Sequence, residues 1–392
     1  MCIVTQVPGH EVLPTRTAYA GFAVFGAFWG AWGASIPAIR DAAGVTDGQL
    51  GTALLFVGAG AVPAMLATGR AVDRWRRPVT AIALAALGLA GVAVAATARD
   101  FASLSIGLAV LGASSGAADV AINAAAGSAQ RATARPVLTR AHGVFSAMVV
   151  VVSLLTGASS SLGAPVVTPF LVVAVGAGAA AIGVGLGPPT EPRTPVPEPT
   201  TSTPTRFAPL LVIGALGAMA FAVENAHQSW SAVFLGSELE AGPVLASAGP
   251  AVFAAVVALT RFSISPLGAR LAPALVATGA ATAAAGTVVM AGAPTTAIAL
   301  VGLAIAAAGT AVVFPLLLGV LTAEVEDRAR GRATSIVTTV AYLGFVAGPI
   351  YVGRWADAMD LRAALLAVAG LAAVLAAATL PALRSARRPA SR

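Results

Sequence analysis

The sequence contains no lysine, one cysteine and few acids. All 23 basic residues are therefore arginines, and with 16 acidic residues the formal net charge is +7. Only 10% of the 392 residues are charged, whereas 58% are hydrophobic; soluble domains carry about 25% charged residues. So few charges cannot cover a soluble globule of this length, and the apolar content excludes a disordered chain. We therefore expect lipid to be the solvent for most of the chain.

Cysteine and histidine are too scarce for two further classes of protein. The single cysteine, Cys2, allows no internal disulfide framework and no thiolate metal cluster. The chain has three histidines, and His10 is close to the terminus. Phosphate-loop, dinucleotide-binding and zinc-protease motifs do not occur. We expect no metal, no cofactor and no enzymatic activity.

Twelve apolar runs are long enough to cross a hydrocarbon core, which takes about 20 helical residues. They lie near residues 17–39, 49–69, 79–98, 102–127, 138–162, 165–186, 207–235, 243–262, 271–291, 295–321, 333–352 and 361–383. No small-residue cleavage site follows the first run, so we expect a retained helix rather than a signal peptide. The predicted fold class is an all-α membrane protein with twelve transmembrane helices.

Arginines between the runs predict the orientation in the membrane. If both termini are cytoplasmic, 19 arginines, Arg261 among them, lie in cytoplasmic segments, and only Arg40, Arg99, Arg354 and Arg362 lie outside. An excess of positive charge is typical of cytoplasmic loops, so the basic residues need no nucleic acid partner. The alanine-, glycine- and arginine-rich composition favours a bacterial source. We therefore predict a multi-pass protein of the bacterial inner membrane with both termini in the cytoplasm.

A polar, proline-rich segment at 188–206 interrupts the pattern of apolar runs. Such a composition predicts an extended linker without a core of its own. It separates six runs from six, so we expect an N-terminal six-helix half at 1–187 and a C-terminal six-helix half at 207–392. Two such halves are typical of transporters built from repeats, which bind substrate near the middle of the bilayer.

Polar residues inside lipid are costly and often functional, and the fourth run contains one such acid. Asn123 follows Asp119 by one helical turn and shares its face. His142 opens the next run, so Asp119, Asn123 and His142 are candidates for one site. Because burial disfavours a charged carboxylate, Asp119 is a candidate proton carrier. The alternatives are a structural pair with Arg140 or His142, and direct hydrogen bonding to substrate.

The seventh run contains the second deeply placed acid, Glu224. Glu224, His227, Gln228 and Ser231 fit one helical face. This face is a candidate for binding a polar substrate, and Glu224 is a second candidate for proton coupling. The alternative is that the helix protrudes from the membrane and these side chains are simply hydrated.

Aromatic residues lie near the middle of the first run, where Trp29 and Trp32 share a face with Phe25 and Phe28. Aromatic belts normally lie at the membrane interface. Tryptophans at mid-span therefore indicate either the lining of a substrate cavity or packing against neighbouring helices. Phe314 of the tenth run, beside a proline, is a candidate for the same cavity or marks a kink.

Three pairs of glycines are spaced four residues apart inside apolar runs. This spacing is typical of helices whose backbones approach closely in a membrane. The pairs are Gly26 and Gly30, Gly112 and Gly116, and Gly344 and Gly348.

The segment after the second run reads GRAVDRWRRP over residues 69–78. It resembles the cytoplasmic signature of the major facilitator superfamily, G-x-x-x-D-R-x-G-R-R, without the second glycine. The resemblance implies the major facilitator fold, with two pseudo-repeat halves, and a gating role for the matching residues. These are Gly69, Asp73, Arg74, Arg76 and Arg77. When the cytoplasmic side is closed, Asp73 is expected to meet the N-terminus of the eleventh helix, where Arg332 is a candidate for an added charge-assisted hydrogen bond. The alternative is that Asp73 pairs with its own arginine cluster.

The pattern Asp119-x-x-x-Asn123, followed by Arg140-x-His142-Gly143, resembles the fucose-permease-like branch of that superfamily. Sugar–proton symporters of that branch carry an acid on the fourth helix and an asparagine four residues later. The resemblance implies a protonatable role for Asp119 and a cavity role for Asn123. The first run lacks the acid that the symporter pattern carries there.

We therefore predict a secondary active transporter that moves a small molecule across the plasma membrane by alternating access, coupled to protons. One alternative is efflux of amphiphilic compounds by proton antiport. An alternative from another class is a membrane sensor that has kept the scaffold without transporting. The expected partners are a small-molecule substrate, protons and the lipid bilayer, with no nucleic acid, and the protein is expected to be a monomer.

Overall fold

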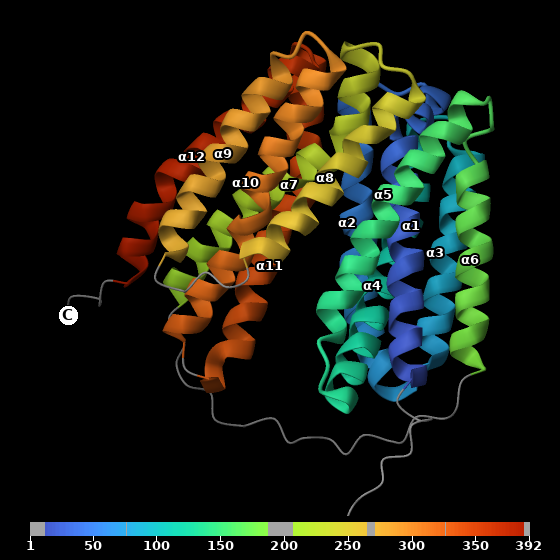
Figure 1. Ribbon diagram of the computed structural model, residues 1–392, viewed down its shortest axis with the longest axis horizontal. Coiled ribbons are helices and arrows are strands. Elements are labelled where there is room, and N and C mark those ends of the chain that lie inside the picture. Colours follow the sequence, from blue (N-terminus) through green and yellow to red (C-terminus); the bar gives the residue numbers. More distant parts are fainter. Residues whose placement is uncertain (1–11, 76, 187–206, 265–270, 326, 388–392) are drawn as a thin grey trace, which may run out of the picture. The chain divides into compact units, whose positions relative to one another are not determined.

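A computed structural model describes residues 12–75, 77–186, 207–264, 271–325 and 327–387. Every regular element in these ranges is an α-helix (Figure 1). The helices are α1 (Val12–Ala43), α2 (Asp47–Trp75), α3 (Arg77–Thr97), α4 (Phe101–Thr133), α5 (Val137–Ser161), α6 (Thr168–Gly185), α7 (Phe207–Glu238), α8 (Pro243–Ile264), α9 (Ala272–Ala291), α10 (Thr296–Glu324), α11 (Asp327–Ala358) and α12 (Leu361–Arg387). The predicted linker at 188–206 lies outside the described residues.

All twelve of these helices are long and apolar enough to cross a membrane, which confirms the predicted fold class. Several extend beyond the apolar run that predicted them. The fourth run ends at residue 127, but α4 continues to Thr133, and α11 begins at Asp327 rather than near 333. Apolar runs mark the part of a helix that lies in lipid, whereas backbone hydrogen bonding continues through polar residues at the membrane surface.

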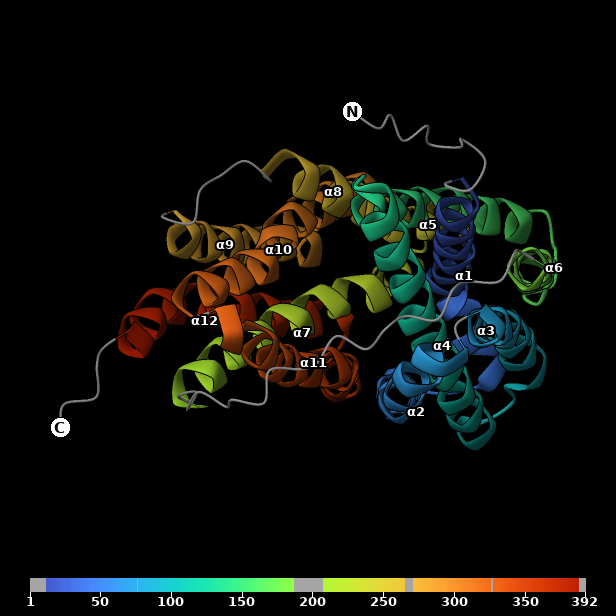
Figure 2. The same cartoon turned by 90° about the horizontal axis from the view of Figure 1, so that it is seen from below.

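The chain divides into two compact units. The first comprises Met1–Gly44 and Phe56–Thr190, and the second comprises Val45–Leu55 and Glu191–Arg392. In the first unit, α1 packs against α4, α5 and α6, and α3 packs against α4 and α6. In the second, α7 packs against α8, α10, α11 and α12, and α9 packs against α10 and α12. Figure 2 shows α3 beside α6 and α9 beside α10, each pair within its own unit.

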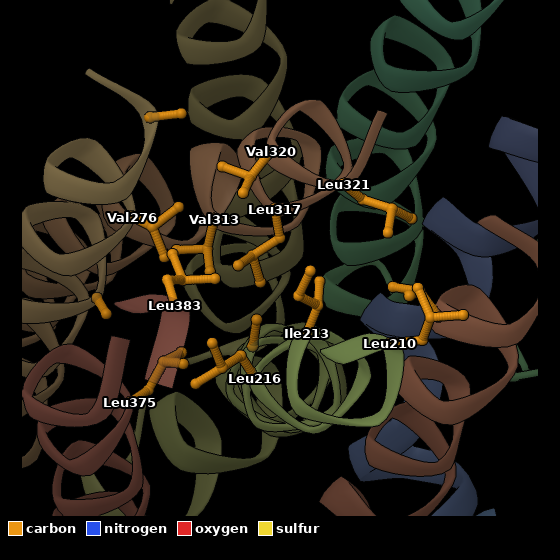
Figure 3. Packing of buried hydrophobic residues seen from close by; sticks show 14 of the residues in the cluster. Leu210, Ile213, Leu216, Val276, Val313, Leu317, Val320, Leu321, Leu375 and Leu383 are labelled. Atoms are coloured by element: carbon orange, nitrogen blue, oxygen red, sulfur yellow. The ribbon is translucent and has the colours of Figure 1, made fainter. Parts of the chain in front are cut away.

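The core of the second unit lies where α7, α9, α10 and α12 meet. Val276, Val313 and Leu383 lie together there in Figure 3. The same buried cluster includes Leu210, Ile213, Leu216, Leu317, Val320, Leu321 and Leu375. Lipid is as apolar as these side chains, so close packing and hydrogen bonds, rather than removal from water, hold such helices together.

The three predicted glycine pairs lie at close helix crossings, which confirms that prediction. A Cβ atom added to these glycines would meet backbone atoms of the neighbouring helix. That helix is α5 for Gly26 and Gly30, α2 for Gly112 and Gly116, and α7 for Gly344 and Gly348. The crossing of α1 and α5 also carries a hydrogen bond, in which the Ser153 hydroxyl donates to the Gly30 carbonyl at 3.1 Å.

The first residues of α2 belong to the second unit and pack there on the end of α11. The Gly48 N–H donates to Oδ1 of Asp357 at 2.7 Å, and the Thr46 hydroxyl donates to Oδ2 at 3.0 Å. A carboxylate suits a helix N-terminus because the first N–H groups have no partner inside the helix. Asp357 therefore caps α2 from another helix.

Candidate functional site

The acid of the first unit lies within α4. That helix begins with a capping box, in which the Asp100 side chain accepts from the Ser103 N–H and the Ser103 hydroxyl accepts from the Asp100 N–H. Further along, the Asn123 amide donates to the Asp119 carbonyl at 2.9 Å and to Oδ1 of Asp119 at 3.0 Å. The i, i+4 spacing thus puts both side chains on one face of α4.

No cation balances Asp119 within the described ranges, where its one side-chain bond is the bond from Asn123. Among the residues that the structure describes, neither Arg140 nor His142 forms an ion pair with Asp119, so the structural pair named as an alternative is not seen. His142 is exposed on α5, and its ring forms a T-shaped contact with the Phe22 ring, with centroids 4.9 Å apart. Asp119 is half-buried and has a neutral partner.

The aromatic residues of α1 divide into packed and partly open members. Trp32 and Phe28 are buried, and Phe28 also contacts Phe170 of α6. Trp29 is half-buried, with its ring edge-on to Phe28 and to Phe25. Trp32 therefore packs inside the unit, and Trp29 is the tryptophan that keeps an accessible side.

Glu224, the acid of the second unit, is paired with an arginine. Nη2 of Arg261 lies 3.2 Å from Oε1 of Glu224, and Nε of Arg261 donates to the Ala311 carbonyl at 3.1 Å. The residue Glu224 is 7% exposed, so it is not simply hydrated. The Arg261 side chain is 44% exposed. Three helices, α7, α8 and α10, therefore meet at this guanidinium.

The Arg261 guanidinium lies near the middle of these helices although its Cα lies in the last turn of α8. Glu224 is 14 residues, about 21 Å, before the end of α7. Ala311 is 15 residues, about 22 Å, after the start of α10, which is at the same end of the unit. Helical side chains lean toward the N-terminus of their helix, so Arg261 reaches back into the unit.

His227, one turn after Glu224 in α7, contacts both α8 and α9. It is completely buried, and its ring nitrogens lie 2.7 Å from the Val223 carbonyl oxygen and 2.9 Å from the Thr287 hydroxyl of α9. Its ring stacks on Phe253 of α8. The residues predicted to share one face have different surroundings: Glu224 pairs with Arg261, His227 is buried between α8 and α9, and Gln228 is exposed.

Phe314 belongs to an aromatic group that sequence reasoning did not find. Its ring lies 4.2 Å, between centroids, from that of Phe221 in α7. Phe221 also meets Tyr342 and Phe345 of α11, at 5.7 and 6.3 Å. The Asn225 amide donates to the Phe345 carbonyl at 2.6 Å. Phe221 precedes Glu224 by one helical turn, so the sequence did contain a signal that an aromatic ring lies next to this acid.

The signature at 69–78 is helical over most of its length. Gly69, Asp73 and Arg74 lie in the last turns of α2, and Arg77 begins α3. Asp73 and Arg74 are exposed, and the Arg74 guanidinium lies 5.4 Å from the Trp75 ring centroid. Arg76 lies outside the described residues. Arg332 is exposed near the start of α11 in the second unit.

No cluster of three or more metal-ligating side chains occurs in the part of the chain that the structure describes. The twelve helices described, in two units and all long and apolar enough to cross a membrane, are the architecture of a polytopic membrane protein. The family model of the Major Facilitator Superfamily matches residues 17–349. The chain therefore belongs to this superfamily: it is a multi-pass membrane transporter of a small molecule and not an enzyme.

Two curated relatives match nearly the whole chain. An uncharacterised MFS-type transporter of Yersinia pestis is 28% identical over 373 residues, covering 94% of this chain and 95% of the relative. An uncharacterised transporter of Sinorhizobium fredii is 27% identical over 372 residues, covering 95% and 98%. Neither name gives a substrate.

Solved structures share the fold at low sequence identity. A mutant of the nucleoside transporter NupG superposes with a TM-score of 0.76 at 12% identity, covering 95% of this chain and 99% of that one. A bacterial homologue of the human lysosomal transporter Spinster has a TM-score of 0.73 at 16% identity, covering 96% and 98%. The peptide transporter PepTSo, of the POT family, has a TM-score of 0.72 at 12% identity, covering 95% and 98%.

Proposed function

We propose that this transporter is a proton-coupled secondary active transporter of the bacterial inner membrane, working as a monomer by alternating access with both termini cytoplasmic. One observation carries the coupling. The Asp119 carboxyl group lies within a spanning helix, is half-buried, and is bonded to a neutral amide rather than to a cation. A proton carrier must exist both with and without its proton, and a neutral partner leaves both forms open.

The neighbours' names do not choose the substrate, because the printed titles include a nucleoside transporter and a peptide transporter. The resemblance of Asp119 and Asn123 to the fucose-permease-like pattern supports symport over efflux. In this proposal Asn123, Trp29 and Phe314 contact substrate, whereas Trp32 and His227, both buried, support the site from behind. The signature residues of α2 and α3, together with Arg332, act in gating.

The test uses purified protein in proteoliposomes, with a substrate found first by ligand-induced thermal stabilisation. We expect Asp119→Asn to retain counterflow exchange and to lose uptake driven by a pH gradient. Asp100→Asn, which changes an exposed acid at the start of the same helix, should leave both activities intact. Undiminished gradient-driven uptake by Asp119→Asn would contradict the assignment of Asp119 as proton carrier.

A further inference from the structure

We infer that the exposed edge of Arg261 and the neighbouring aromatic group form a binding site for a planar organic anion, an aromatic carboxylate. This inference deepens the proposed function, on which it rests, by naming a substrate class and a residue that anchors it. The aromatic group is Phe221, Phe314, Tyr342 and Phe345.

Arg261 is fixed on one edge and open on the other. Nε and Nη2 share one edge of the guanidinium, and they bind the Ala311 carbonyl and the Glu224 carboxylate. A guanidinium carries five N–H donors and no acceptor. Nη1, with two of these donors, has no protein partner among the residues whose placement is described. The Arg261 side chain as a whole is 44% exposed.

The open edge requires water or a ligand because of its depth. Glu224 and Ala311, which hold the guanidinium, lie about 21 and 20 Å along their helices from the nearer ends. Arginine N–H groups that face hydrocarbon are costly, and charged residues at such depth face a hydrated interior or pair with an opposite charge. Glu224 satisfies one edge, so the other edge is the group available to an incoming anion.

The aromatic group lies one helical turn from the ion pair on both helices that hold it. Phe221 precedes Glu224 by three residues in α7, and Phe314 follows Ala311 by three residues in α10. Because α7 and α10 run in opposite directions, both steps, about 4.5 Å each, lead toward the same end of the unit. The contact between the two rings, at 4.2 Å, agrees with this arrangement.

These two features together select the ligand. A guanidinium binds a carboxylate through paired N–H donors, and aromatic rings prefer edge-on or offset contacts with another ring. Phe221, Phe314 and Phe345 are half-buried and Tyr342 is exposed, so ring surface remains for a ligand. A carboxylate joined to a flat ring fits a charged donor with aromatic surface one turn away. The Glu224–Arg261 ion pair has no net charge. A bound anion would give the site one negative charge, and a proton that enters together with the anion would cancel that charge.

Thermal unfolding of the purified full-length protein tests the ligand class without any transport step. The probes are benzoate and phenylacetate, with benzamide and phenylacetamide as uncharged matches and acetate as an anion without a ring. We expect both aromatic acids to raise the unfolding temperature. The amides and acetate should raise it much less at equal concentration. Equal shifts with acid and amide, or no shift with either acid, would overturn the inference.

Variants test the residues. Arg261→Lys keeps the charge that balances Glu224 but loses the fork, so we expect apparent affinity for benzoate to fall about tenfold or more. Phe314→Leu should weaken phenylacetate binding about threefold to tenfold. Arg384→Gln removes an exposed arginine at the end of α12 and should leave affinity unchanged. If the Arg261→Lys variant does not fold, the double variant Glu224→Gln with Arg261→Gln is measured instead. The inference requires that this double variant also fails to bind benzoate.

The outcomes separate this inference from the proposed function. Benzoate binding that depends on Arg261 supports the binding site. If Asp119→Asn at the same time keeps unaltered gradient-driven uptake, the assignment of Asp119 as proton carrier is contradicted. If the protein takes up another compound with protons but does not bind aromatic acids, the proposed function is supported and the binding-site inference is overturned. Affinity for benzoate that is the same in Arg261→Lys and the parent also overturns it.

Discussion

Asp119 in the first unit and Glu224 in the second lie far from the ends of their helices, and these two acids have different partners. Asp119 accepts a hydrogen bond from an amide of its own helix, four residues away. Glu224 pairs with Arg261, which comes from another helix and also binds a third. Protonation of Glu224 leaves a guanidinium without its counter-charge. Protonation of Asp119 removes a charge that no cation balances within the described part of the first unit.

This difference suggests two roles for acidic residues within spanning helices, one in joining helices and one in carrying a proton. Glu224 joins α7 to α8 and, through Arg261, to α10, so it organises the second unit and orients the guanidinium. Within the described residues the Asp119 carboxylate bonds only to Asn123 of its own helix, so we expect its charge to change with little effect on packing. We therefore expect substitutions at Glu224 to act mainly on stability and substitutions at Asp119 mainly on transport.

The largest effect on stability is expected for Glu224→Gln. Removing one partner of a completely buried ion pair costs about 3–5 kcal/mol. Since Arg261 is nearly half exposed and water can screen it, we expect a loss of about 2–3 kcal/mol, against less than about 1 kcal/mol for Asp119→Asn. Thermal or denaturant unfolding of the purified variants measures both. Equal losses of unfolding free energy in Glu224→Gln and Asp119→Asn would contradict the proposed difference between the two acids.

The next prediction sharpens the comparison by removing both charges. In Glu224→Gln with Arg261→Gln, no uncompensated guanidinium remains, and the amides can still bond. Replacing a buried ion pair by neutral groups is often close to neutral in stability. We expect the double variant to recover at least half of the loss seen in Glu224→Gln. Additive losses in the double-mutant cycle would show that the two side chains are not coupled.

Much of the fold could be predicted from the sequence, because membrane spans are set by apolar length and backbone hydrogen bonding. The glycine pairs predicted the close helix crossings, and i, i+4 spacing predicted the pair of Asp119 and Asn123. These signals are all local, since each depends on residues within one helix. Helix ends beyond the lipid, such as the last turns of α4, carry no apolar signal and were missed.

The partners from other helices could not be predicted in the same way. Arg261 stands at the end of its apolar run, where arginines usually belong to loops, and only its side-chain direction brings it to Glu224. Glu224 and His227 both contact α8, yet Glu224 pairs with an arginine there, whereas His227 stacks on Phe253 and also meets the Thr287 hydroxyl of α9. Periodicity places a residue on a face but does not say which neighbour that face meets.

A smaller effect is expected for Asn123→Ala, which tests the amide side of the comparison. The substitution removes the bonds to the Asp119 carbonyl and carboxylate. A hydrogen bond contributes about 0.5–1.5 kcal/mol net, and one to a charged group somewhat more; we expect a loss of about 1 kcal/mol. Asn123→Gln, with a longer side chain, is the matched control and should retain part of it. A loss as large as that of Glu224→Gln would mean that Asn123 does more than hold Asp119.

The smallest effect is expected at Asp100, an acid outside the spanning helices that serves as a reference for the other two. Hydrogen bonds from the Ser103 backbone and side chain hold the pKa of Asp100 below its ordinary value of 3.8. A carboxyl whose pKa is lowered by folding stabilises the folded state above its unfolded pKa, and this contribution is lost as the pH falls through the folded pKa. The capping contribution should therefore be complete at pH 6 and fade below about pH 4. We expect Asp100→Asn, which can still cap the helix, to abolish this part of the pH dependence while changing stability at pH 6 very little. Unfolding temperatures of parent and variant from pH 6 down to pH 3 measure it, and parallel curves over that range would show that the Asp100 carboxylate contributes nothing through its charge.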